Sequence, residues 1–185
     1  MNSGGRGADA ADFIVIMGVA GSGKTTVGRL LAKRLGWRFI EGDDFHGQEN
    51  VGKMSQGIPL SDEDRSSWLE RLRRAIQDGG PVVVACSALK KRYREILSNG
   101  HTGIRFVFLN GDYDLIRSRL EARKSHFMTA RMLDSQFADL EIPLLDEAVH
   151  VDAALSPEEI VPALLLLTVS QPGDSDFTDS PVQTR

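Results

Sequence analysis

The sequence predicts an α/β fold in which a parallel sheet of about five strands carries helices on both faces. Short, nearly continuous apolar runs alternate along the chain with segments whose apolar residues recur at helical spacing. Such runs are typical of strands buried on both faces, and their alternation with helices is typical of a parallel sheet with helical crossovers.

Five apolar runs are the expected strands, at residues 12–18, 38–44, 81–88, 104–111 and 150–154. After the first run, Val27, Leu31 and Leu35 recur at helical spacing, and Gly36 follows as a stop signal. The same spacing predicts helices around residues 115–120 and 160–167. Each strand is therefore separated from the next by chain that can cross over the sheet.

A further helix is expected within residues 61–80. Ser61 and Asp64 form a capping box at its start, and Gly79 marks its end. Its apolar stripe includes Trp68, and Arg65 lies three residues earlier on the same face. We therefore expect Arg65 at the edge of the core, facing a cleft.

Length and composition indicate one compact domain. The chain has 185 residues, of which 41% are hydrophobic and 26% charged, and this is ordinary for a single core. We assign the domain to residues 12–168. The ends, 1–11 and 169–185, are rich in Gly, Ser, Asp and Pro and are expected to be disordered arms.

Net charge, the lengths of the apolar runs and the cysteine count indicate the cellular compartment and the kinds of partner that we expect. The net charge of −4 provides no basic field for a nucleic acid backbone, and no apolar run has the length of a membrane span or a secretory signal. The single cysteine, Cys86, excludes an internal disulfide and suits a reducing compartment. We expect a cytoplasmic protein that binds neither nucleic acid nor membrane.

The pattern GxxxxGKT occupies residues 18–25, between an expected strand and an expected helix. Glycines at these positions let backbone amides surround a polyphosphate at a helix N-terminus. Lys24 provides a mobile charge for the β- and γ-phosphates, and the Thr25 hydroxyl is placed to hold Mg²⁺, so ATP with Mg²⁺ is expected. The expected nucleotide site in this segment comprises Gly18, Val19, Ala20, Gly21, Ser22, Gly23, Lys24, Thr25 and Thr26.

Acidic residues follow the second expected strand. Glu41, Asp43 and Asp44, with His46, should lie at the carboxyl edge of the sheet, where ligands of parallel sheets bind. A carboxylate there can accept the proton of an attacking hydroxyl, and Asp43 is the preferred candidate. His46 is a candidate for binding the acceptor. The chain has no NKxD motif to read guanine, which counts against a GTPase.

Further candidate site residues, mostly basic, follow the third and fourth expected strands. Ser87 and Lys90 lie at the end of the third strand and the first turn of the next helix, where an anionic or hydroxylated substrate can bind. Arg119 and Arg123 share a helix face and can contact the phosphates, with a short segment beyond them as a lid. His126 is a further candidate for the acceptor. Three basic residues of the helix after Lys90 are expected on a solvated face: Lys91, Arg92 and Arg94.

Four strings in this order resemble the small P-loop gluconate kinases, which are related to shikimate kinase and the nucleoside monophosphate kinases: MGVAGSGKTT, EGDDFHGQENVGKMSQGIPLSDEDRSSWL, VVACSALKKRYRE and ARKSHFM. The resemblance covers residues 13 to about 167. It implies a P-loop kinase fold with a small lid and transfer of phosphate from ATP to the 6-hydroxyl of D-gluconate. Homodimers are frequent in such families.

The resemblance also bears on individual residues. Gluconate is a polyhydroxylated carboxylate, and Lys53, Arg65, Lys90 and His46 offer the cations and hydrogen-bonding groups that it needs. The second-strand motif of the family resembles DxD, whereas this chain has Glu41, Gly42 and Asp43. The second acid is kept and the first is longer, which favours Asp43 as the base. Independently of the resemblance, an arginine over the γ-phosphate stabilises the charge that develops in transfer, so Arg123 is expected as a third catalytic residue beside Lys24 and Asp43.

Two alternatives to a gluconate kinase stay open. The spacing of the cations would also suit a kinase of another small hydroxylated acid, such as shikimate. The chain could instead be a nucleotide-binding regulator without transfer activity, although Lys24, Thr25, Asp43 and Arg123 together argue against it.

Overall fold

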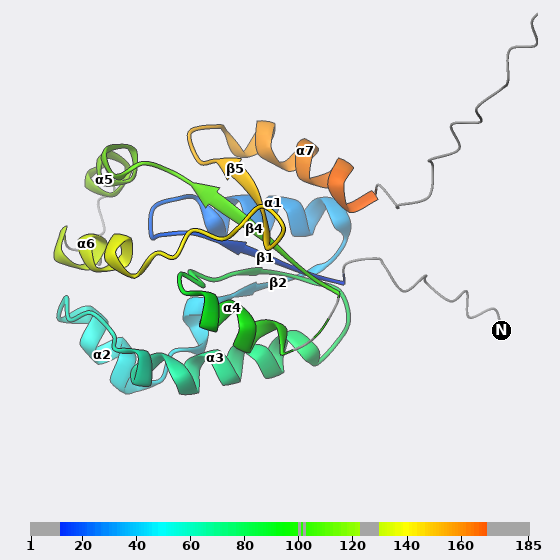
Figure 1. Ribbon diagram of the computed structural model, residues 1–185. Coiled ribbons are helices and arrows are strands. Elements are labelled where there is room, and N and C mark those ends of the chain that lie inside the picture. The colour runs from blue at the N-terminus through cyan, green and yellow to red at the C-terminus, as the bar shows by residue number, and fades with distance from the viewer. Residues whose placement is uncertain (1–11, 100, 102, 123–129, 170–185) are drawn as a thin grey trace, which may run out of the picture.

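The computed structural model describes residues 12–99, 101, 103–122 and 130–169 (Figure 1). Within them, five parallel strands form one sheet in the order β2-β3-β1-β4-β5. The strands are β1 (Phe13–Met17), β2 (Arg38–Glu41), β3 (Val82–Ala85), β4 (Ile104–Asn110) and β5 (Ala148–Asp152). The predicted α/β fold is confirmed, and each strand lies within or overlaps its expected run.

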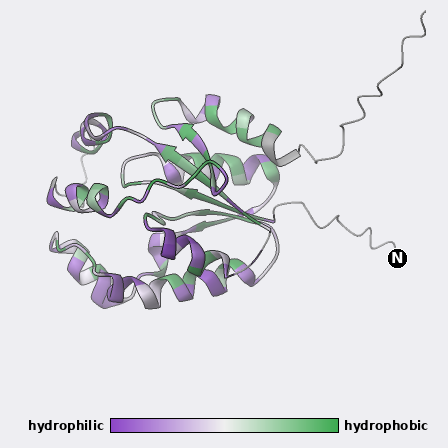
Figure 2. Ribbon diagram, viewed as in Figure 1, coloured by the Kyte–Doolittle hydropathy of each residue, from purple (hydrophilic) through white to green (hydrophobic). Residues whose placement is uncertain are grey.

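Helices cover both faces of the sheet (Figure 1). The helices of the described residues are α1 (Lys24–Leu35), α2 (Gln48–Ser55), α3 (Asp62–Gln77), α4 (Lys91–Ser98), α5 (Tyr113–Glu121), α6 (Ala130–Asp139) and α7 (Pro157–Val169), with a short 3₁₀ helix, η1 (Gly42–Phe45). The α1 and α7 helices pack together on one face, while α3 and α4 pack together on the other. Figure 2 shows hydrophobic residues concentrated in the strands between these layers.

Alternation along β1 builds the two apolar layers. Val15 and Met17 pack toward α3 and α4, whereas Ile14 and Ile16 pack toward α1 and α7. All four side chains are at most 1% exposed, as expected for a strand covered on both faces. Cys86, which follows β3, is buried in the first of these layers.

The helix boundaries follow the predicted signals. The α1 helix is followed by Gly36, whose left-handed φ of 68° suits a residue without a Cβ. The α3 helix begins with the complete capping box of Ser61 and Asp64. It ends at Gln77, and Gly79 takes a φ of 124° in the turn that follows.

One sequence expectation is wrong in the α4 helix. Arg94 was expected on a solvated face, but its side chain is buried. Its guanidinium donates hydrogen bonds to the backbone oxygens of Leu89 and Glu141 and pairs with Glu147 at 3.2 Å. A buried arginine is tolerated because several acceptors surround its fixed donors.

The α5 and α6 helices sit at the carboxyl end of the strands, beside the loop that follows β1 (Figure 1). A smaller apolar cluster joins them to the loops after β1 and β3, through Val19, Leu89, Ile116 and Leu133. In the described part of the chain, no helix is both long and apolar enough to cross a membrane.

Candidate active site

The loop between β1 and α1 has a backbone that requires glycine. Gly18 adopts a φ of 139°, and a Cβ built there would lie 2.8 Å from the carbonyl oxygen of Leu109. Gly21 takes a φ of 86° and lies against the side chain of Leu120 in α5. These positive φ values are strained for residues with a side chain. Ser22 Oγ is buried and has no hydrogen-bond partner among the described residues, so the loop fits an additional polar ligand such as a phosphate.

Lys24 and Thr25 open the α1 helix directly after this loop. The Lys24 ammonium donates a 3.0 Å hydrogen bond to the carbonyl oxygen of Val19, so the side chain folds back over the loop. The side chain of Thr25 lies beside the Glu41 carboxyl at the end of β2. Burial raises the pKa of the Glu41 carboxyl above its usual value, and the neighbouring Thr25 hydroxyl opposes that shift. A hydroxyl and a carboxylate side by side are oxygen ligands of the kind that Mg²⁺ prefers.

A pocket of about 100 Å³ lies beside the loop. The structure brings six of the predicted site residues to its wall: Ala20, Lys24, Asp43, His46, Arg65 and Ser87. The rest of the wall is Met54, Pro59, Leu60, Trp68, Leu89, Met132, Ser135 and Gln136. Phosphate-loop residues, a carboxylate and a cation thus share one cavity, which is the arrangement that phosphoryl transfer to a small acceptor needs.

The carboxylate and the histidine come from the turn after β2. Asp43 lies in η1 with 76% of its side chain exposed, and its carboxylate is 4.0 Å from His46 Nε2. The His46 ring stacks on Trp68 with their centroids 4.3 Å apart, and its Nδ1 lies 3.4 Å from the Asn50 amide nitrogen. Burial lowers the pKa of His46, which favours the neutral ring at physiological pH.

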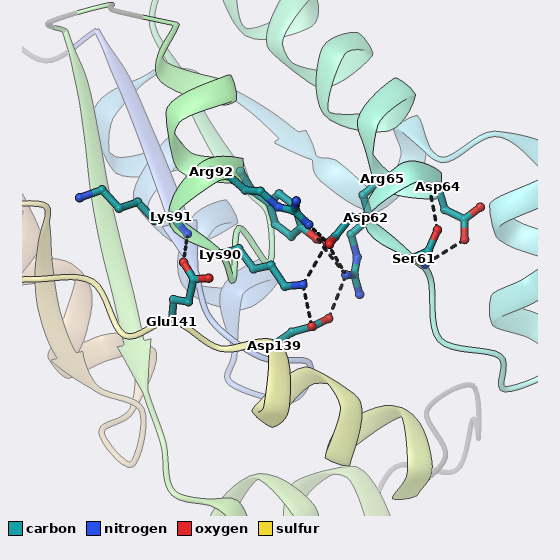
Figure 3. A network of polar contacts seen from close by, with 10 residues as sticks. Ser61, Asp62, Asp64, Arg65, Lys90, Lys91, Arg92, Asp139 and Glu141 are labelled. Carbon is teal, nitrogen blue, oxygen red and sulfur yellow. Dashed lines mark hydrogen bonds and ion pairs between the residues drawn. The ribbon is translucent and has the colours of Figure 1, made fainter.

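Charged side chains from three helices meet at the rim of the pocket (Figure 3). Arg65 pairs with Asp139 of α6 at 2.9 Å and donates to the Tyr93 hydroxyl at 3.0 Å. Lys90 pairs with Asp62 at 3.0 Å and with Asp139 at 2.9 Å. Asp62 also contacts Arg92 and the Tyr93 hydroxyl. The two predicted acceptor cations, Arg65 and Lys90, are therefore held together by the same carboxylate of α6.

Other predicted site residues lie elsewhere. Lys53, near the end of α2, pairs with Asp64 at 2.6 Å and is not in the pocket wall. Arg119 lies in the last turn of α5, a helix that packs against the phosphate loop. Arg123 and His126 fall outside the described residues, so their predicted roles stay predictions.

The contribution of α6 to the site was not predicted from the sequence. Met132, Ser135 and Gln136 line the pocket, and the Gln136 side-chain oxygen accepts a 2.6 Å hydrogen bond from the backbone N–H of Ala20. The signal available in the sequence was spacing, since Met132, Gln136 and Asp139 recur at helical intervals and share one face.

Comparison with known proteins decides the family. A family model described as shikimate kinase matches residues 20–166. A thermosensitive gluconokinase of Escherichia coli K12 is 48% identical over 142 residues, which cover 75% of this chain and 76% of that protein. The chain belongs to the gluconokinase family. A gluconokinase of Arabidopsis thaliana is another relative, 43% identical over 169 residues, covering 82% of this chain and 89% of that protein.

A solved gluconokinase structure agrees with this assignment. The enzyme from Sinorhizobium meliloti 1021 superimposes with a TM-score of 0.78 at 42% identity, covering 88% of this chain and 93% of that one. Membership of the gluconokinase family confirms the predicted P-loop kinase fold and the resemblance stated from the four sequence strings.

Proposed function

We propose that this chain is an ATP-dependent gluconokinase that transfers the γ-phosphoryl group of ATP to the 6-hydroxyl of D-gluconate, giving 6-phosphogluconate and ADP. Family membership supports the reaction class. The observation that carries the proposal is that Lys24 of the phosphate loop, Asp43 and Arg65 line one pocket. Groups for the nucleotide, for the reacting hydroxyl and for the carboxylate of the acceptor thus face one cavity.

The phosphate loop and the first turn of α1 would hold the nucleotide. Loop amides and the Ser22 hydroxyl offer donors to phosphate oxygens, and Lys24 meets the charge that develops on the transferred group. Thr25, with Glu41 beside it, would hold Mg²⁺, which neutralises charge on the β- and γ-phosphates when bound. Arg119 and Arg123 are proposed to contact the phosphates from the other side.

Asp43 is the proposed base. An alcohol is a poor nucleophile at neutral pH, so a carboxylate within hydrogen-bonding distance both orients the hydroxyl and receives its proton late in transfer. Asp43 lines the pocket, whereas Glu41 is engaged with Thr25. This division favours Asp43 for the proton and Glu41 for the metal.

The acceptor would bind between α3 and η1. Arg65 at the pocket wall, with Lys90 behind it, provides positive charge for the carboxylate of gluconate. His46 and Ser87 offer hydrogen bonds to its hydroxyls, and His126 is proposed to join them. Lys53 is the weakest of the proposed acceptor ligands because it is outside the pocket wall, whereas Lys90, also outside it, shares Asp139 with the wall residue Arg65. A cytoplasmic location and a homodimer also stay proposals.

A coupled assay of ADP release tests the function. We would supply gluconate, shikimate or no acceptor to the wild type and to Lys24→Met. We expect acceptor-dependent ADP release with gluconate alone, and a loss of several orders of magnitude in Lys24→Met because the lysine stabilises charge in the transition state. Release with shikimate instead would identify a different acid kinase. Nucleotide binding without any acceptor-dependent release would indicate a regulator.

A further inference from the structure

The α6 helix contacts both parts of the candidate site with one of its faces. Gln136 and Asp139, three residues apart, project from this face toward the phosphate loop and the charged rim respectively. The adjacent face is apolar and packs through Leu133 and Phe137 into the cluster that contains Val19 of the phosphate loop. One short helix is thus mounted on the nucleotide loop and contacts the acceptor cations.

The first contact engages a backbone amide of the phosphate loop. Gln136 Oε1 accepts a hydrogen bond of 2.6 Å from the backbone N–H of Ala20, the third residue of the GxxxxGKT loop. Backbone amides of such loops are the donors that bind phosphate oxygens. A nucleotide phosphate that takes this amide must release Gln136.

The second contact engages the acceptor cations. The two carboxylate oxygens of Asp139 are each 2.9 Å from a cation, one from Arg65 and the other from Lys90 (Figure 3). In the proposed function these cations attract the carboxylate of gluconate. That carboxylate therefore competes with Asp139 for the same donors.

We propose that Gln136 and Asp139 are positioning residues that couple nucleotide binding to acceptor binding through α6; the identity of the acceptor rests on the proposed function. Each ligand displaces one anchor of the same helix. Once the first ligand has loosened α6, the second displaces the remaining anchor at lower cost and binds more tightly. By linkage the effect is reciprocal, so gluconate must raise nucleotide affinity by the same factor.

The coupling should be modest because one neutral hydrogen bond sets its size. We expect the ratio of gluconate dissociation constants, without and with nucleotide, to be about five in the wild type. In Gln136→Met, which keeps the length of the side chain but removes the acceptor, gluconate should bind the free enzyme about as tightly as it binds the wild-type nucleotide complex. The ratio should then fall to about one.

Calorimetry of gluconate binding, with and without a non-hydrolysable ATP analogue and Mg²⁺, measures this ratio. Asp139→Asn removes the other anchor and should also bring the ratio close to one. Asp134→Asn is the matched control, since it makes the same change on α6 at a residue bound to Tyr113 and outside the pocket wall. Thermal unfolding checks that each variant is folded.

The outcomes separate the coupling from the function. A ratio near one in the wild type, or a wild-type ratio retained in Gln136→Met, overturns the coupling while gluconate binding itself is kept. Loss of the ratio in Asp134→Asn as well as in Gln136→Met also overturns it, because any change in α6 would then suffice. A wild type that does not bind gluconate overturns the proposed acceptor, and the coupling with it.

Discussion

The indole nitrogen of Trp68 donates a hydrogen bond of 2.7 Å to the carbonyl oxygen of Gly42. This contact ties the α3 helix to the residue immediately before Asp43. Trp68 is 1% exposed and its ring also stacks on His46. One buried side chain therefore positions both the proposed base and a proposed acceptor ligand.

Replacing Trp68 with Phe should lower kcat and stability together. The ring is kept in part, but the Gly42 carbonyl loses its donor, which should cost about 1–3 kcal/mol of unfolding free energy. The turn that carries Asp43 is then less firmly held. Urea unfolding and steady-state kinetics measure the two effects. Trp37→Phe, on the opposite face of the sheet, is the control and should leave kcat unchanged; an unaltered kcat in Trp68→Phe would remove this role.

Asp43→Asn should depress kcat by roughly 10²-fold or more while gluconate still binds, because the amide keeps size and hydrogen bonding but cannot take a proton. Glu41→Gln should be milder and should shift the Mg²⁺ dependence, since Glu41 contacts Thr25. Kinetics with magnesium titrations, and calorimetry of gluconate binding, distinguish the two. A nearly normal kcat in Asp43→Asn would contradict this role. The proton acceptor would then be Glu41, or the site would act only by positioning the hydroxyl.

Arg94→Lys should destabilise the protein although it keeps the charge. A lysine cannot match the fixed donors that serve several backbone oxygens and Glu147, and a disrupted buried pair costs on the order of 3 kcal/mol. Urea unfolding gives the loss directly. The exposed Arg34→Lys on α1 is the control and should change stability by less than about 0.5 kcal/mol. Equal effects of both substitutions would contradict the buried role.

Stability should depend on pH through Asp64. Hydrogen bonding to Lys53, and then to the Ser61 backbone, lowers the pKa of Asp64 from 3.8 to about 2. Because the folded-state pKa is the lower one, the ionised carboxylate stabilises the fold above about pH 4, and this contribution disappears as the pH falls toward 2.

Acid unfolding of wild type and Asp64→Asn measures this contribution. The stability difference between them should be present at neutral pH and shrink between about pH 4 and pH 2. Glu63→Gln removes a charge from the same helical turn and serves as the control. A difference that persists unchanged at pH 2 would assign the effect to hydrogen bonding of the side chain rather than to its charge.

Most of the fold could be predicted because most helices and strands carry a recognisable pattern within their own sequence. The strands are continuous apolar runs, and α3 carries a capping box and an apolar stripe. The α2 helix lacks such marks, since Asn50 is its buried residue and Val51 is 46% exposed. Its position is set by tertiary contacts, such as the hydrogen bond from Asn50 to the Asp64 carbonyl, which no local pattern reveals.

The candidate site also has a part that could be predicted from local sequence and a part that could not. The phosphate loop has a fixed spacing dictated by backbone geometry, so its residues could be read directly. The partners of the cations could not, because Asp139 is 74 residues from Arg65 in sequence. Arg94 did carry a signal, since it lies three residues before the buried Leu97 and so shares its helix face. That spacing distinguishes it from its exposed neighbours Lys91 and Arg92.

Because Cys86 is buried, modification of its thiol can report local opening of the structure around it. Burial raises the pKa of this thiol to about 12, so thiol reagents, which attack the thiolate, cannot modify it in the closed sheet. Cys86 is the single cysteine of the chain, so every modified molecule records exposure at the end of β3, next to Ser87 in the pocket wall. Labelling rates with and without nucleotide would therefore show, without any introduced probe, how far a bound ligand suppresses local opening at the end of β3.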